Sequence, residues 1–157
     1  MKALIILFAA LLSLNFGPEV KVYDGTGTYR SDVICTVRDS KVYDGTSSYS
    51  SDIICTVRNN QVFRGRSSYS SDILFTVRDG KVYDGTSRYS SDIIMTIKDG
   101  KVYRGTSTYR SDVLANISDG KVYSGTSGYR SDILFHFDGT LSLTEFVAVL
   151  YAISQKR

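Results

Sequence analysis

Apolar and polar positions recur along the chain with a period of 20 residues. Each unit holds a run of β-branched and apolar residues, a two-residue turn, a second short apolar run and a polar stretch. A fixed period of this length is the mark of a repeat architecture, so the chain predicts copies of one structural unit. The six units begin at Lys21, Lys41, Gln61, Lys81, Lys101 and Lys121.

Each unit predicts two short strands joined by a tight turn. Residues 73–78 and 81–83 are rich in β-branched and aromatic side chains, and Asp79-Gly80 separates them. An Asp-Gly pair between such runs favours a type I′ hairpin turn, because both turn positions need a positive φ. Pairing across this turn places Val77 opposite Val82.

Strand alternation then divides the side chains of a hairpin between two faces. The first face is expected to carry Ile73, Phe75, Val77 and Val82. The second face is expected to carry Leu74, Thr76, Arg78 and Tyr83.

These hairpins predict an all-β repeat array, either a β-solenoid or stacked β-hairpins, with two short strands per 20-residue repeat. A closed barrel of twelve strands is the main alternative, because it would also remove the open sheet edges. We expect the repeats over 18–140 and a C-terminal capping α-helix over 141–157. The helix is predicted from the capping box of Ser142 and Glu145 and the apolar residues that follow at helical spacing.

Residues 1–17 predict a signal peptide or an N-terminal cap. Lys2 precedes a twelve-residue apolar run from Ala3 to Leu14, which suits export and is too short to span a membrane. An exported protein would be periplasmic or extracellular; otherwise we expect a cytoplasmic one.

Composition narrows the function classes. Hydrophobic residues make up 42% of the chain and the net charge is +3, which is typical of a folded domain. The mild and interspersed charge makes nucleic acid an unlikely partner class. Cys35 and Cys55 are expected to be buried free thiols. Six equal copies supply no asymmetric catalytic constellation, so we expect no enzyme, no catalytic residue, no metal site and no cofactor.

The candidate interaction stripe combines an aromatic and an aliphatic row on the second face. If the fold leaves this face uncovered, it forms a long patch of the kind that marks an interface; a fold that buries both faces would make it a second core layer. The stripe consists of Tyr23, Tyr43, Phe63, Tyr83, Tyr103, Tyr123, Ile34, Ile54, Leu74, Ile94, Leu114 and Leu134.

A ladder of Ser-Asp pairs precedes the longer strand of every unit. The Asp side chains suit hydrogen bonds to the backbone of a turn, which is the interpretation we favour. Stacked carboxylates that bind calcium are the alternative. The ladder contains Asp32, Asp52, Asp72, Asp92, Asp112 and Asp132. The loop from Asp138 to Glu145 resembles half of an EF-hand calcium loop, but Leu134 and His136 stand where two ligands are needed.

The repeat core, Y-x-G-x-S-x-Y-x-S-D-I, and the terminal segment LTEFVAVLYA resemble small bacterial tandem-repeat proteins of unassigned function. The resemblance covers residues 21–153 and implies an architecture. We therefore expect a non-enzymatic structural or interaction protein that associates with itself or binds a protein or glycan. A calcium-dependent binding module is the alternative. An ice-binding β-solenoid comes third, since a Thr row runs through five of the six units.

Overall fold

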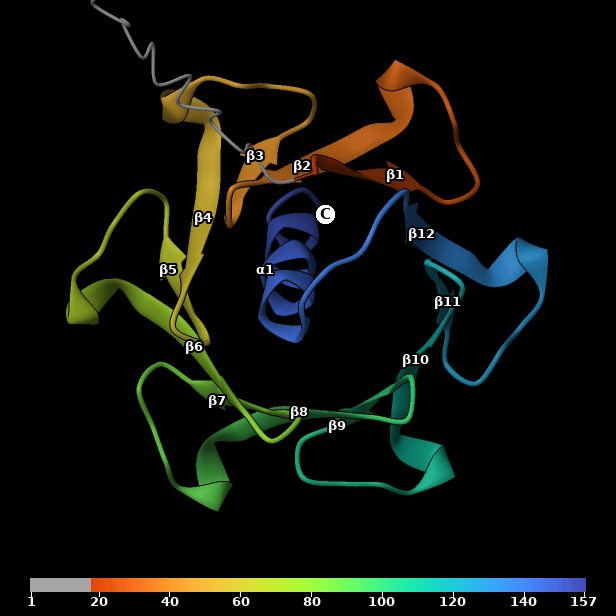
Figure 1. The fold of residues 1–157 in the computed structure, drawn as a ribbon. Coiled ribbons are helices and arrows are strands. Elements are labelled where there is room, and N and C mark those ends of the chain that lie inside the picture. The colour runs from red at the N-terminus through yellow and green to blue at the C-terminus, as the bar shows by residue number, and fades with distance from the viewer. Residues whose placement is uncertain (1–17) are drawn as a thin grey trace, which may run out of the picture.

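The computed structural model describes residues 18–157 as a closed barrel of twelve antiparallel strands with one helix inside it (Figure 1). The predicted signal peptide or cap at 1–17 lies outside the described residues. The strands are β1 (Val20–Asp24), β2 (Val33–Arg38), β3 (Lys41–Asp44), β4 (Ile53–Arg58), β5 (Gln61–Arg64), β6 (Ile73–Arg78), β7 (Lys81–Asp84), β8 (Ile93–Lys98), β9 (Lys101–Arg104), β10 (Val113–Ser118), β11 (Lys121–Ser124) and β12 (Ile133–Phe137).

The predicted hairpins are confirmed. Val77 pairs with Val82 and Thr76 with Tyr83 across the turn between β6 and β7. Both turn residues have a positive φ, 49° at Asp79 and 73° at Gly80, as a type I′ turn requires. The turns without glycine adopt the same backbone, with φ values of 50° and 59° at Asn59 and Asn60.

The two ends of the repeat array meet. Strand β1 pairs with β12, setting Val22 opposite Phe137 and Tyr23 opposite His136. The prediction of a solenoid or of stacked hairpins is therefore wrong, and the closed barrel that we weighed against it is correct. Closure gives every strand two partners, so neither the first nor the last unit leaves an exposed edge.

A bulge between neighbouring units changes the predicted faces. Val62 pairs with Phe75, but the next residue, Phe63, pairs with Ile73, so Leu74 has no partner of its own. Directly paired residues share a face, which places Ile73 on the outer face with the aromatic row. Leu74 instead packs against the buried interior. The assignment of Ile73 to the first face and Leu74 to the second is wrong for this reason.

The barrel interior is a tightly packed apolar core. A ring of fully buried valines, with Val22 and Val82 as examples, lies beside the column that begins with Cys35 and Cys55. On the outer face, the threonines of the longer strands are buried, and each hydroxyl donates to a backbone carbonyl at the start of the next unit's loop. Thr36, for example, donates to the carbonyl of Gly45 at 2.7 Å.

Helix α1 (Leu143–Ser154) runs through the barrel and does not cap its end (Figure 1). The predicted capping box is present, since Ser142 accepts from the N–H of Glu145 and Glu145 accepts from that of Ser142. Buried residues occur on all sides of the helix, including Ala148 and Val149 at successive positions. A twelve-stranded barrel is wider than its own side chains can fill, which explains why the helix lies inside.

The interior side chains that meet the helix differ in size. Cys55 lies against α1, with its Sγ 3.6 Å from the carbonyl oxygen of Ala148. Larger side chains reach the helix from other strands: Phe75 meets Tyr151 edge-on at 5.8 Å between ring centroids, and Phe135 stacks on Phe146 at 6.3 Å. One interior column thus varies in size to fit a single asymmetric filler; it consists of Cys35, Cys55, Phe75, Met95, Ala115 and Phe135.

Outside the barrel, each unit extends a loop that ends in a short 3₁₀ helix. We call residues 24–32 petal 1, and their equivalents 44–52, 64–72, 84–92, 104–112 and 124–132 petals 2 to 6 (Figure 1). The 3₁₀ helices span Arg30–Asp32, Ser50–Asp52, Ser70–Asp72, Ser90–Asp92, Arg110–Asp112 and Arg130–Asp132. Within residues 18–157, no helix is long and apolar enough to cross a membrane.

The position of α1 predicts that Phe146→Ala lowers the free energy of unfolding by about 3–5 kcal/mol in urea titration, because the ring is 5% exposed and packs on Phe135 and Phe137. Leu143→Ala, on the same helix but 37% exposed, is the control and should cost less than about 0.5 kcal/mol. Similar losses in the two variants would contradict a helix packed inside the barrel.

The buried thiols predict a loss of stability at alkaline pH. Burial raises the pKa of Cys35 and of Cys55 from 9.0 to about 12. Between these values the unfolded chain releases thiol protons that the folded chain retains, so stability falls as pH rises from about 9 towards 12. The thermal midpoint of Cys35→Ala/Cys55→Ala should fall less steeply over this range. Equal slopes in the two proteins would show that the thiols are not the cause.

Candidate functional site: the clefts between petals

The aspartates of the Ser-Asp ladder hold the turn of each petal, and in petals 2 to 6 each pairs with a serine five residues earlier. Asp52 accepts from the hydroxyl of Ser47 at 2.5 Å, and the same Ser47 oxygen accepts from the backbone N–H of Tyr49 at 3.1 Å. The equivalent Ser and Asp are bonded in petals 3 to 6. In petal 1, Gly27 stands in place of the serine, and the N–H of Tyr29 donates directly to Asp32 at 2.9 Å.

The six ladder carboxylates are distributed around the barrel, one to a petal, and are not stacked on one another. Within residues 18–157, no three His, Cys, Asp or Glu side chains come together as a metal site would require. Asp138, from the loop that resembles half of an EF-hand, accepts from the backbone N–H of Lys21 at 2.7 Å. It therefore contributes to the contact between the end of the array and β1. The Thr row is also divided among petals and forms no flat ladder.

The two rows of the predicted interaction stripe lie apart. In the aromatic row, on the outer face, Tyr43 and Phe63 are buried and the other four rings are half-buried. In the aliphatic row, Ile34, Ile54, Leu74 and Leu134 pack against the interior, whereas Ile94 and Leu114 are 39% and 41% exposed. The bulge described above separates the rows. A role for the aromatic row in binding stays a prediction.

A second set of tyrosines, not predicted as a site, is far more exposed. They lie directly before the 3₁₀ helix of each petal, and their side chains are 73–77% exposed. The set consists of Tyr29, Tyr49, Tyr69, Tyr89, Tyr109 and Tyr129. Their presence in all six units was visible in the sequence, but alternation within strands says nothing about residues in a loop. Their exposure therefore could not be derived.

Clefts open between neighbouring petals, and three of them share one lining. We number each cleft by the unit that supplies its floor. Cleft 1 has a volume of about 370 Å³, cleft 5 about 300 Å³ and cleft 6 about 400 Å³. Each is lined by five kinds of residue: the Lys that starts the unit, the Tyr of the aromatic row, the Arg of the 3₁₀ helix, the Val or Ile that starts the longer strand, and a Thr of the next petal. In cleft 5 these are Lys101, Tyr103, Arg110, Val113 and Thr126.

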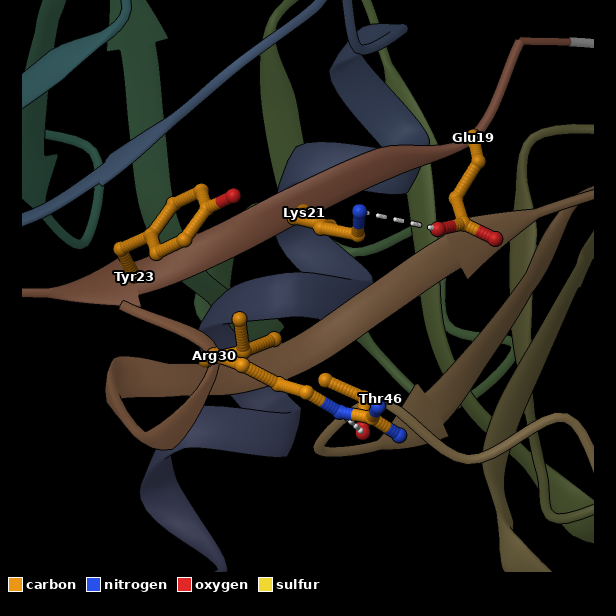
Figure 2. Close-up of a pocket in the computed structure, with 6 residues that line it drawn as sticks. Glu19, Lys21, Tyr23, Arg30 and Thr46 are labelled. Carbon is orange, nitrogen blue, oxygen red and sulfur yellow. Dashed lines mark hydrogen bonds and ion pairs between the residues drawn. The ribbon is translucent and has the colours of Figure 1, made fainter. Parts of the chain in front are cut away.

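Figure 2 shows how the side chains lie in cleft 1. Arg30 reaches from petal 1 to petal 2, where its Nε donates to the hydroxyl of Thr46 at 3.3 Å. Glu19, just before β1, pairs with Lys21 at 3.6 Å, and the ring of Tyr23 lies on the same strand as Lys21. The cleft thus combines a guanidinium, an ammonium, a hydroxyl and an aromatic ring.

The other three units differ at the residues that would form these clefts. Ser50, Ser70 and Ser90 stand where clefts 1, 5 and 6 have arginine. A different arginine, from the end of the preceding long strand, covers the outer ring. Arg38 lies 4.7 Å from the centroid of Tyr43, Arg58 lies 5.4 Å from that of Phe63 and Arg78 lies 4.5 Å from that of Tyr83.

Clefts 5 and 6 carry positive charge without a neighbouring carboxylate. In the described part of the chain, no Asp or Glu lies within 4.0 Å of the charged nitrogens of Lys101, Arg110, Lys121 or Arg130. The arrangement offers hydrogen-bond donors and positive charge beside a half-buried ring. It can bind an anion without covalent chemistry.

His136 is part of cleft 6 and has a structural role. It replaces the threonine of its column, and its Nδ1 lies 2.9 Å from the carbonyl oxygen of Gly25, as the hydroxyls of the threonines do in other units. The carbonyl accepts, so Nδ1 carries the hydrogen. The ring also stacks on Tyr23, at 5.0 Å between centroids, across the junction of β12 and β1.

Comparison with known proteins identifies the family. The search of curated proteins and the search of solved structures gave no match. The sequence model of the family described as 6-fold beta flower protein matches residues 22–150, which takes in all six units and most of α1. Six equal petals around one closed barrel agree with that description, and the chain belongs to the 6-fold beta flower protein family.

Proposed function

We propose that this protein is a non-enzymatic binding module that contacts a carbohydrate chain through its petals. The observation that carries the proposal is the ring of six tyrosines, each 73–77% exposed at the same place in its petal. A large aromatic side chain left in water gains no stability from burial, and its repeated exposure at one position in all six petals points to a contact surface.

Tyrosine suits contact with a sugar. Its ring offers a flat apolar face to the C–H groups of a pyranose, while its hydroxyl serves the polar edge of the same ligand. A tyrosine also loses little conformational entropy on binding, because its side chain has two torsion angles.

The petal corner holds the backbone of each exposed tyrosine in place. In petal 2 the N–H of Tyr49 donates to Ser47, and its carbonyl accepts from the N–H of Asp52 at 3.0 Å. Both groups belong to the hydrogen-bonded corner, so the ligand need not order this segment. Preorganisation of this kind favours binding.

Six equal sites favour a repetitive ligand. A single stacked ring contributes little, but sites joined on one rigid barrel bind a polymer with much higher avidity than any one of them alone. A protein with one asymmetric site would be suited to a single small molecule instead. Export, predicted from residues 1–17, would bring the module to glycans outside the cytoplasm.

The test is binding of the full chain to immobilised cellulose, chitin, dextran and galactan. For the polysaccharide that binds, Tyr49→Ala/Tyr69→Ala should weaken the apparent affinity by about tenfold or more, since each lost aromatic contact is worth on the order of 1 kcal/mol. Ser48→Ala/Ser68→Ala, at the preceding exposed positions, is the matched control and should bind as the unchanged protein does.

Absence of binding to all four polysaccharides and to acidic polysaccharides would overturn the proposal, as would equal losses in the tyrosine and serine variants. Sedimentation of the same proteins gives the competing outcome. An oligomer that dissociates in the tyrosine variant but not in the serine variant would assign the ring to self-association instead.

A further inference from the structure

We propose that clefts 5, 6 and 1 form one continuous site for the anionic groups of a carbohydrate, either carboxylate or sulfate. The inference rests on the proposed function, because it specifies which carbohydrates the module would prefer. The inference divides the six units into two groups of three. The clefts of units 5, 6 and 1 bind acidic sugars, and units 2, 3 and 4 do not.

The three clefts are neighbours only because the barrel closes. Units 5 and 6 are adjacent in sequence, and unit 1 lies next to unit 6 through the pairing of β12 with β1. Cleft 6 is built across this junction, with Lys121, Tyr123 and Arg130 from the last unit and Thr26 and Thr28 from the first. The chain thus places its three cleft arginines, Arg30, Arg110 and Arg130, on consecutive petals.

The position of the arginine distinguishes the two halves. In units 2 to 4 a guanidinium from the preceding strand already covers the outer ring, as Arg78 covers Tyr83. The corresponding residues before units 5, 6 and 1 are Lys98, Ser118 and Asp138. Among the described residues, no guanidinium lies over the rings of Tyr103, Tyr123 or Tyr23. The rings of Tyr103 and Tyr123 are therefore available to a ligand, whereas one face of the Tyr23 ring is covered by His136.

The charge of these clefts favours an anion. Arg110 and Lys101 line cleft 5 together, and Arg130 and Lys121 line cleft 6 together, with no carboxylate in either lining. Cations brought together without a counter-ion repel one another, and an oxyanion between them removes that repulsion. Cleft 1 carries a weaker charge because Glu19 pairs with Lys21.

The donor geometry suits an oxyanion attached to a sugar ring. A guanidinium presents parallel N–H donors that match the two oxygens of a carboxylate or two of a sulfate. In cleft 1, the Nε of Arg30 is engaged with Thr46, which holds the side chain across the cleft while its terminal nitrogens remain available. The neighbouring tyrosine supplies an apolar edge for the ring that bears the anion.

The experiment measures binding of the full chain to dextran sulfate, to oligogalacturonate and to uncharged dextran at physiological salt. The unchanged protein should bind at least one acidic polymer more tightly than dextran. Arg30→Ser/Arg110→Ser/Arg130→Ser installs the residue that units 2 to 4 carry and should weaken that binding by at least about tenfold. All three arginines are exposed, so the thermal midpoint should not change.

A charge-matched control separates a site from general attraction. Arg64→Ser/Arg88→Ser/Arg104→Ser removes the same charge from exposed positions outside the three clefts and should retain binding to the acidic polymer. Equal losses in the two triple variants would overturn the inference, as would a wild-type protein that prefers neither acidic polymer. Binding to a neutral polysaccharide that depends on Tyr49 and Tyr69 would still uphold the proposed function in that case. The acidic polymer that is preferred tells whether carboxylate or sulfate is the ligand group.

Discussion

The pairing of β1 with β12 is the constraint on which the rest of the molecule depends. Six units of two strands each leave two free edges in any open arrangement, and closure removes both. Closure also creates an interior too wide for the strands' own side chains, which α1 fills. The same pairing brings petal 6 beside petal 1 and so completes cleft 6. Core, helix position and candidate site therefore follow from one contact between the ends of the repeat array.

Local structure could be predicted from the sequence because it depends on neighbouring residues. The turn at Asp79-Gly80 needs only the conformational freedom of those two positions, and the capping box of Ser142 and Glu145 needs one helical turn. Ring closure depends on strand tilt and on the number of units, which no single unit encodes. The place of α1 could not be predicted either, because an apolar helix suits the end of an array as well as the inside of a barrel.

The bulge explains why the candidate site could be predicted only in part. Strict alternation joins Tyr83 with Leu74, but the bulge between units joins the aromatic row with Ile73 and its equivalents and moves the aliphatic row inward. The petals lie beyond the strands, where periodicity carries no information. Arg30, Arg110 and Arg130 occupy a position that holds serine in the other three units, yet nothing in the linear sequence brings the first of them next to the last.

The barrel also shows how a repeat protein can become asymmetric without loss of its scaffold. Residues that hold the petals, such as Asp92 and Gly85, recur in every unit. The outer surface varies: an arginine lies on the aromatic ring in three units and on the neighbouring petal helix in the other three. The arginines on the petal helices are exposed, so their exchange for serine costs little stability while it changes the charge of the cleft.

A cross-link between the first and last units tests ring closure most directly. Tyr23 and His136 are paired across the junction of β1 and β12, so Tyr23→Cys/His136→Cys, made in a chain whose Cys35 and Cys55 are replaced by alanine, should form an intramolecular disulfide under mild oxidation. Tyr23→Cys/Tyr83→Cys, with its cysteines in units on opposite sides of the ring, is the control and should not. Complete intramolecular cross-linking in the first protein alone supports the closed barrel. Its absence, or cross-links only between separate molecules, would contradict it.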